Sequence, residues 1–206
     1  KGLETLIVRH MTGTDGLQPA ASTGTGSAPT SDVASLAQAP MGGTGYLAGS
    51  PKDYDRAHAL DVHQLFAFLR ATQPDAFQKL AIVDAHDAKD INRLKFLTRL
   101  SAELGKRGAI DVLRKGIDHH PAGHFDLFYG KPSEGNAKAA ALHAKNRFTI
   151  TRQLAYSIDE TRRALDLGLF INGLPIATFE LKNSLTKQTV VDAVAQYQRD
   201  RDPKEK

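Results

Sequence analysis

The stretch that decides the fold of this chain is residues 164–183, ALDLGLFINGLPIATFELKN. Before its central Asn172-Gly173 pair, apolar residues recur at every second position, a period typical of a strand with one buried face. Asn and Gly both tolerate positive φ, so the pair predicts a tight hairpin turn. A second strand follows the turn. The apolar positions of the two strands are Leu165, Leu167, Leu169 and Ile171, then Ala177, Phe179 and Leu181.

The register of this hairpin follows from its apolar faces. If the Asn-Gly pair formed the turn with regular pairing, Asp166 would oppose Phe179 and lie on the wrong face from Glu180. One extra residue, in the loop or in a bulge near Pro175, shifts the pairing by one, and proline lacks the N–H that a regular ladder needs. Asp166 then opposes Glu180, and Leu167 opposes Phe179. We predict this shifted register.

Asp166, Glu180 and Lys182 then share the polar face of the hairpin. Two close carboxylates repel unless a cation lies between them, and Mg²⁺ takes one or two carboxylates together with waters and phosphate oxygens. The Lys182 ammonium can hold an attacking water or a phosphate. This set is what a metal-dependent phosphodiesterase needs. The structural alternative is an exposed Glu-Lys pair on a solvated strand, with Asp166 as a polar neighbour.

Three stretches resemble a known family: residues 146–157 (NRFTITRQLAYS), the hairpin, and residues 189–205 (TVVDAVAQYQRDRDPKE). They are similar to the N-terminal nuclease region of the restriction (HsdR-type) subunit of type I restriction–modification enzymes. The resemblance extends from about residue 53 to the C-terminus and is most specific over 146–203. It implies an α/β fold with a PD-(D/E)xK restriction-endonuclease-like core, in which helices flank a mixed central sheet.

The resemblance also implies roles for individual residues. Asp166 and Glu180 would bind Mg²⁺, and Lys182 would be the catalytic lysine. The family often carries a Gln followed four residues later by a Tyr on the next helix. In this chain Gln196 and Tyr197 are adjacent. Gln196 is therefore carried over as a catalytic candidate, and the role of Tyr197 stays open.

Composition is that of an ordinary globular protein. Of 206 residues, 41% are hydrophobic and 24% charged, with a net charge of +4, which permits a phosphate-rich partner without requiring one. The absence of cysteine excludes disulfides and thiolate metal sites and fits a reducing cytoplasm. No apolar run approaches the roughly 20 residues of a membrane span. Because the chain begins with Lys1, we expect it to be a piece of a longer protein.

We expect one endonuclease domain over residues 1–206, with its catalytic core at 146–200. Residues 12–50 are rich in Gly, Ser, Thr, Ala and Pro, so we predict a low-complexity loop insertion that is mobile to about residue 38. No Walker A sequence is present. The resemblance therefore implies that ATP acts only through translocase domains outside this chain.

Helical periodicity predicts helices at residues 3–11, 53–72, 90–105, 137–145 and 189–199. Asp90 is expected to cap the third of these. The first carries Glu4, a candidate for the acidic first-helix residue that recurs in such nucleases. Further strands are expected at residues 108–119, 124–130 and 148–156.

Two other clusters allow a functional or a structural interpretation. Gly42, Gly43 and Gly45 suggest a phosphate cradle, but no GxxxxGK[ST] follows and a flexible loop is favoured. His119, His120 and His124 lie with Asp118 in a short segment that would suit a transition metal. A polar hairpin loop is favoured there too, since no anchoring ligand is indicated elsewhere.

Basic residues near the motif predict contacts with DNA phosphates. We expect such contacts from Arg152, Lys187 and Arg199, giving sequence-independent affinity that weakens with salt; the alternative is a solvated surface. No helix-turn-helix, zinc finger or aromatic platform suggests base reading. The resemblance implies double-stranded DNA as substrate, and methyltransferase and specificity subunits as partners.

Two functions follow from different classes of protein. The favoured one is a Mg²⁺-dependent endonuclease module that cuts DNA non-specifically within an ATP-driven restriction complex. The other is a non-catalytic DNA-docking or assembly domain that retains the nuclease shape. An RNA-directed nuclease is weaker, since nothing in the sequence reads a 2′-hydroxyl. Metal binding and the need for Lys182 separate the endonuclease from the docking domain, because a docking domain need not bind Mg²⁺ and would tolerate loss of Lys182.

Overall fold

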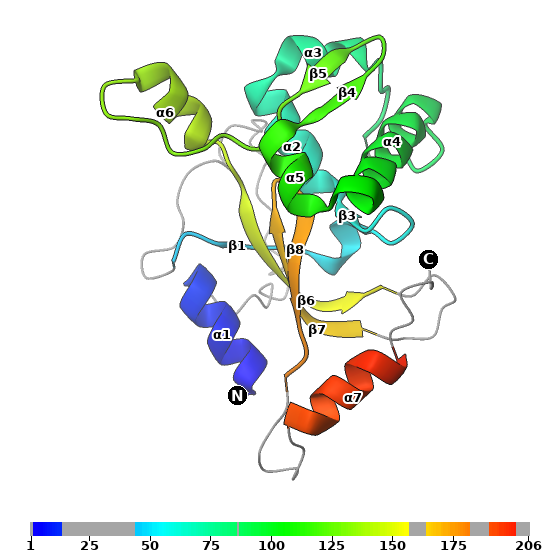
Figure 1. Cartoon of the computed structure of the whole chain (residues 1–206), viewed down its shortest axis with the longest axis vertical. Helices are drawn as coiled ribbons and strands as arrows, with labels where there is room; N and C mark the ends of the chain where they lie inside the picture. Colours follow the sequence, from blue (N-terminus) through cyan, green and yellow to red (C-terminus); the bar gives the residue numbers. More distant parts are fainter. Residues whose placement is uncertain (1, 14–43, 86, 157–163, 182–189, 201–206) are drawn as a thin grey trace, which may run out of the picture.

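The structure is a computed structural model that describes residues 2–13, 44–85, 87–156, 164–181 and 190–200. Within these ranges it is a mixed α/β protein (Figure 1). The elements, in chain order, are α1 (Leu3–Thr12), β1 (Leu47–Ala48), the 3-10 turn η2 (Pro51–Asp53), β2 (Tyr54–Asp55), β3 (Leu60–Asp61), α2 (Val62–Thr72), α3 (Pro74–Lys79), α4 (Ile91–Arg107), α5 (Ala109–Lys115), β4 (Ile117–His119), β5 (Gly123–Phe125), α6 (Ala137–His143), β6 (Phe148–Ala155), β7 (Ala164–Ile171), β8 (Leu174–Phe179) and α7 (Val190–Asp200).

The central sheet has four strands in the order β1-β6-β7-β8. Strand β1 pairs with β6 in parallel, and the other two pairings are antiparallel. The expected mixed sheet is therefore confirmed. Helix α1 packs on this sheet through Val8, which clusters with Ile150 of β6 and Leu167 of β7.

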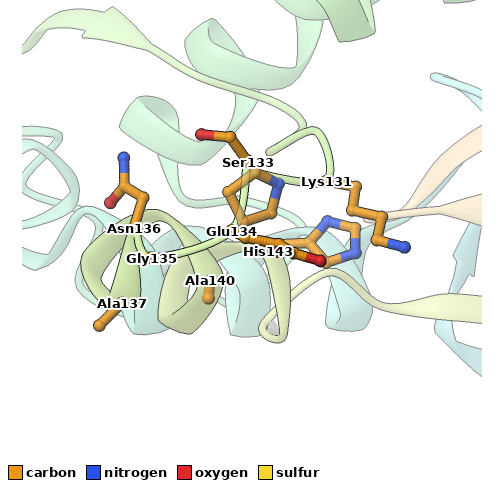
Figure 2. Close-up of a pocket in the computed structure, with 9 residues that line it drawn as sticks. Lys131, Ser133, Glu134, Gly135, Asn136, Ala137, Ala140 and His143 are labelled. Atoms are coloured by element: carbon orange, nitrogen blue, oxygen red, sulfur yellow. The ribbon is translucent and has the colours of Figure 1, made fainter.

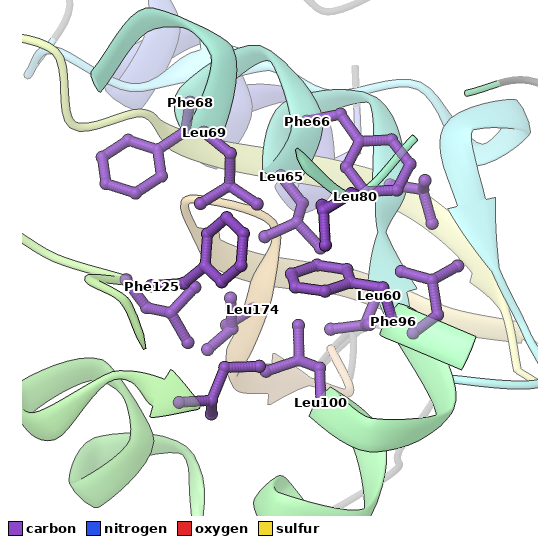
Figure 3. Packing of buried hydrophobic residues seen from close by; sticks show 14 of the residues in the cluster. Leu60, Leu65, Phe66, Phe68, Leu69, Leu80, Phe96, Leu100, Phe125 and Leu174 are labelled. Atoms are coloured by element: carbon purple, nitrogen blue, oxygen red, sulfur yellow. The ribbon is translucent and has the colours of Figure 1, made fainter. Parts of the chain in front are cut away.

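Most of the buried apolar residues lie in a helical lobe at one end of the sheet (Figure 1). Phe66 and Leu69 of α2 pack there with Phe96 of α4 (Figure 3). Leu174, the first residue of β8, is fully buried in the same cluster. The turn end of the β7–β8 hairpin is thus inserted into the lobe, and its open end points away from it.

The single helix expected over residues 53–72 is wrong in its first part. Helix α2 begins at Val62, because the Asp61 side chain accepts a hydrogen bond from Gln64 N at 3.1 Å and caps the helix. Leu60, which fits the helical period, is instead fully buried in β3, opposite Asp55. Apolar residues continue with helical spacing before Val62, so this spacing alone does not show where the helix begins.

The strand expected over residues 108–119 is also mostly wrong. Gly108, at φ 80°, separates α4 from a second helix, α5. Asp111 stabilises this helix by pairing with Arg107 at 3.2 Å and Lys115 at 2.6 Å, both four residues away. Strand β4 begins only after Gly116. The strand expected over 124–130 is limited to β5, which ends at Phe125.

The remaining predicted elements are confirmed within one or two residues. Asp90 caps α4 by accepting from Arg93 N at 2.9 Å, and the helices at 3–11, 137–145 and 189–199 correspond to α1, α6 and α7. The mobile segment predicted up to residue 38 and the glycines at 42 and 43 lie outside the described residues. In the part of the chain that is described, no helix is long and apolar enough to span a membrane.

Asp61 is expected to make stability depend on pH. Its side chain is buried and Oδ2 has no hydrogen-bond partner among the described residues; burial raises the pKa of this carboxyl from 3.8 to about 7. The folded protein therefore holds the proton more tightly than the unfolded chain does. The resulting stability is full below pH 3.8 and is lost as pH rises through about 7.

Asp61→Asn should remove this dependence, because asparagine still caps a helix but does not titrate. Urea unfolding at several pH values between about 4 and 8 measures it, with a slope of up to about 1.4 kcal/mol per pH unit attributable to Asp61. Asp75→Asn, at an exposed position on α3, serves as the control. Equal pH dependence in wild type and Asp61→Asn would contradict the prediction.

Candidate functional site

The β7–β8 hairpin has the register that the sequence predicts. Asn172 and Gly173 form the turn, since Ile171 pairs with Leu174. The pairing then shifts between Leu169 and Phe170, so that one extra residue of β8 follows Pro175. Beyond this bulge Leu167 opposes Phe179. Continued one step beyond this last observed pair, the same register places Asp166 opposite Glu180.

The turn of this hairpin is buried, which fixes the direction of both strands. Asn172 is fully buried, at φ 51°. Its Oδ1 accepts from Arg147 N at 2.6 Å and its Nδ2 donates to Leu127 O at 2.9 Å. Gly173 O accepts from Asp61 N at 2.9 Å. The hairpin is therefore tied to the lobe at its turn.

At the open end of the hairpin Asp166 lies half-buried on β7, between the buried residues Leu165 and Leu167. Its Oδ2 accepts a hydrogen bond from Leu181 N at 2.5 Å. This contact holds the chain just past the end of β8 against β7. Glu180, which is also half-buried, directly precedes Leu181 and therefore lies at the same end of the sheet.

Two carboxylates on neighbouring strand ends suit a hard cation. Mg²⁺ needs only one or two carboxylates, since waters and phosphate oxygens complete its coordination. Across the described ranges, no group of three or more His, Cys, Asp or Glu side chains is arranged to hold a metal. The two carboxylates at this end match the one or two that Mg²⁺ takes and are fewer than the three or four protein ligands that Zn²⁺ takes.

Several candidate residues lie wholly or partly outside the described structure. Lys182 and Lys187 fall within residues 182–189, which are not described. Gln196, Tyr197 and Arg199 belong to α7, but their side chains are not described. Their roles therefore stay predictions.

Arg152, expected to contact phosphate, is paired with an acidic residue. Its Nε lies 2.6 Å from Glu4 Oε1 on α1, and its Nη2 donates to Thr5 Oγ1 at 3.2 Å. The neighbouring Gln153 also donates to Glu4, at 3.0 Å. Sequence reasoning singled out Glu4 and Arg152 separately and missed Gln153. Nothing in the sequence signals the contacts of Glu4 with Arg152 and Gln153, because 148 residues or more separate Glu4 from them.

The histidine cluster forms a hairpin, the favoured of its two interpretations. Strands β4 and β5 pair antiparallel, with His119 opposite Gly123. His124 Nδ1 lies 2.8 Å from Asp118 Oδ1, and the His119 ring packs edge-on against Phe96. Burial is the main cause that lowers the pKa of His119. The cluster therefore supports the hairpin and the lobe beneath it.

A cavity of about 460 Å³ lies between the loop at 131–136 and α6 (Figure 2). Its ionisable lining residues are Lys131, Glu134 and His143. His143 Nδ1 contacts Tyr129 O at 2.8 Å, and Tyr129 O also accepts from Asn146. Asn146 binds Asn172 at 3.0 Å, so the cavity lies toward the turn end of the hairpin, away from Asp166.

Comparison with known families gives one match. Residues 129–206 match the family model described as "Type I restriction enzyme R protein N terminus (HSDR_N)". The match includes α6, β6, the β7–β8 hairpin and α7, and so contains both carboxylates. It confirms over these residues the resemblance found in the sequence. No curated protein and no solved structure matches the chain.

Proposed function

We propose, from the match of residues 129–206 to the family model of the type I restriction enzyme R protein N terminus, that this chain is a Mg²⁺-dependent endonuclease domain with a PD-(D/E)xK core. It would cleave double-stranded DNA without sequence choice of its own. The observation that supports this proposal most is the bulged register of the β7–β8 hairpin. The hydrogen bond from Leu181 N to Asp166 adds to it, because it holds Glu180 at the open end of the hairpin.

The proposed roles follow from the chemistry of each side chain. Asp166 and Glu180 would hold Mg²⁺, which when bound neutralises charge on a phosphate and makes a bound water more acidic. The Lys182 ammonium would orient the attacking water or stabilise the charge that develops on the phosphate. Gln196, on the helix that follows, would help to position these groups.

The wider setting is proposed from the family. The R protein would work with methyltransferase and specificity subunits in the cytoplasm, and ATP would act through translocase domains elsewhere in the subunit. Site recognition would then belong to the specificity subunit. The domain expected at residues 1–206, with its core at 146–200, would be responsible only for cleaving the DNA.

Cleavage of supercoiled plasmid by the complete R subunit, assembled with its partner subunits and supplied with ATP, tests this proposal. Cleavage is expected with Mg²⁺ and should stop with EDTA. The Asp166→Asn subunit in the same complex controls for a contaminating nuclease. Cleavage that persists in Asp166→Asn at the wild-type rate would contradict the assignment. DNA binding without any cleavage would favour the docking domain.

Lys187 is expected to contribute to DNA affinity through a phosphate contact. It is a better test than Arg152, whose guanidinium contacts Glu4, and than Arg199, which lies only three residues from the candidate Gln196. Lys187→Ala should weaken binding of unrelated duplexes equally and reduce the slope of log K against log salt by about one unit. Fluorescence anisotropy at several salt concentrations measures both. Lys106→Ala, at an exposed position of α4, should change neither quantity.

A further inference from the structure

Glu4 on α1 is held by two successive residues of the central strand β6. Arg152 Nε lies 2.6 Å from Oε1, and Gln153 Nε2 donates to Oε2 at 3.0 Å. The Glu4 and Arg152 side chains are only 18% and 19% exposed. Both oxygens of this carboxylate are therefore engaged, and the ion pair is partly shielded from solvent.

This arrangement requires an unusual backbone at Gln153. Successive side chains of a strand point to opposite faces, so Arg152 and Gln153 would not normally reach one carboxylate. Gln153 has φ 47° in the interior of β6, a left-handed conformation that is unfavourable for a non-glycine residue. Such strain persists only where the surroundings enforce it. The contact with Glu4 is one interaction that enforces it.

The strained residue lies across the ladder from the candidate site. In the β6–β7 ladder Arg152 opposes Leu167 and Leu154 opposes Leu165. Gln153 is therefore opposite Asp166, the carboxylate that accepts from Leu181 N. The Glu4–Gln153 hydrogen bond therefore connects α1 to the position of β6 that lies opposite Asp166 in the ladder.

We propose that Glu4, Arg152 and Gln153 form a clamp of positioning residues that fixes β6 opposite Asp166, and that Glu4 does not bind the metal. The inference rests on the proposed function for the role of Asp166. Two observations separate Glu4 from the metal ligands. Both of its oxygens accept from β6, and no three-carboxylate group in the described chain can hold a metal.

The test uses Glu4→Gln and Gln153→Gly in the full chain. Glycine removes the amide but tolerates φ 47°, so it releases the contact without adding strain. The first readout is hydrogen exchange of the Leu181 amide, which donates its hydrogen bond to Asp166. This measurement needs no metal. The second is Mg²⁺ affinity by titration calorimetry. Glu103→Gln is the matched control, because Glu103 forms ion pairs with Arg99 and Arg107 on α4, in the helical lobe.

Both variants are expected to speed Leu181 exchange about tenfold and to weaken Mg²⁺ binding about tenfold, with the double variant no worse than either. Glu103→Gln should leave both readouts unchanged. The clamp is overturned if both variants exchange Leu181 at the wild-type rate. It is also overturned if Glu4→Gln loses Mg²⁺ as fully as Asp166→Asn while Gln153→Gly binds normally, since Glu4 would then be a ligand. If the wild type binds no Mg²⁺, the proposed function fails and the exchange readout alone decides the clamp.

Discussion

Replacing Gly173 with alanine is expected to destabilise the fold by about 3 kcal/mol or more, from strain combined with overpacking. Gly173 has φ 82°, and an added Cβ would lie near Asp61 O and the Leu65 backbone, at 2.4 and 2.7 Å. Neither obstacle is the flexible end of a side chain. The hairpin turn would have to leave the lobe, and a loss of this size is a large part of a typical domain's stability.

Urea unfolding of Gly173→Ala measures the effect, with Gly105→Ala as the control. Gly105 lies in the interior of α4, where an added Cβ meets nothing within 4 Å. Alanine there should stabilise the helix by up to about 1 kcal/mol. If the two substitutions shift the unfolding midpoint in the same direction, the turn is not held in the lobe as described.

Replacing Asp166 is expected to remove both Mg²⁺ binding and DNA cleavage while the fold survives. Asp166→Asn is the sharper variant, since its amide oxygen can still accept from Leu181 N but carries no charge for the metal. We expect Mg²⁺ affinity to fall by more than about 100-fold, beyond the range seen when an outer-shell partner is lost. Asp166→Ala should lose the Leu181 contact as well.

Titration calorimetry and circular dichroism on the same samples separate ligand loss from unfolding. Glu134→Gln is the matched control, because Glu134 is an exposed carboxylate beside α6, toward the turn end of the hairpin. Normal Mg²⁺ binding by Asp166→Asn would remove Asp166 from the site and would leave the hairpin register as a structural feature only.

The hairpin was predictable because three local signals agree. The period of two, the Asn-Gly turn and the proline that disturbs the ladder each limit the register, and the observed bulge lies directly after Pro175. Helix-capping residues were equally informative, since Asp90 correctly predicted the start of α4. The same rule applied to Asp61 would have placed the start of α2 correctly.

The errors arose where local pattern conflicts with long-range packing. Leu60 fits a helical face but is buried as a strand residue. The apolar residues on both sides of Asp111 are compatible with a strand, whereas ion pairs four residues apart and burial of Val112 and Leu113 favour α5. The burial of Asn172 and the left-handed conformation of Gln153 depend on partners remote in sequence, which no periodicity reports.

The most direct test of the nuclease assignment is DNA cleavage by the Lys182→Ala R subunit, assembled with its partners and measured in a single turnover at saturating Mg²⁺. We expect Mg²⁺ and DNA binding to stay close to wild type. Cleavage should fall by about 10²-fold or more, the scale of losing one group that stabilises the transition state. A Lys182→Ala subunit that cuts DNA at the wild-type rate would contradict the nuclease assignment of this motif and leave the docking domain as the function of this chain.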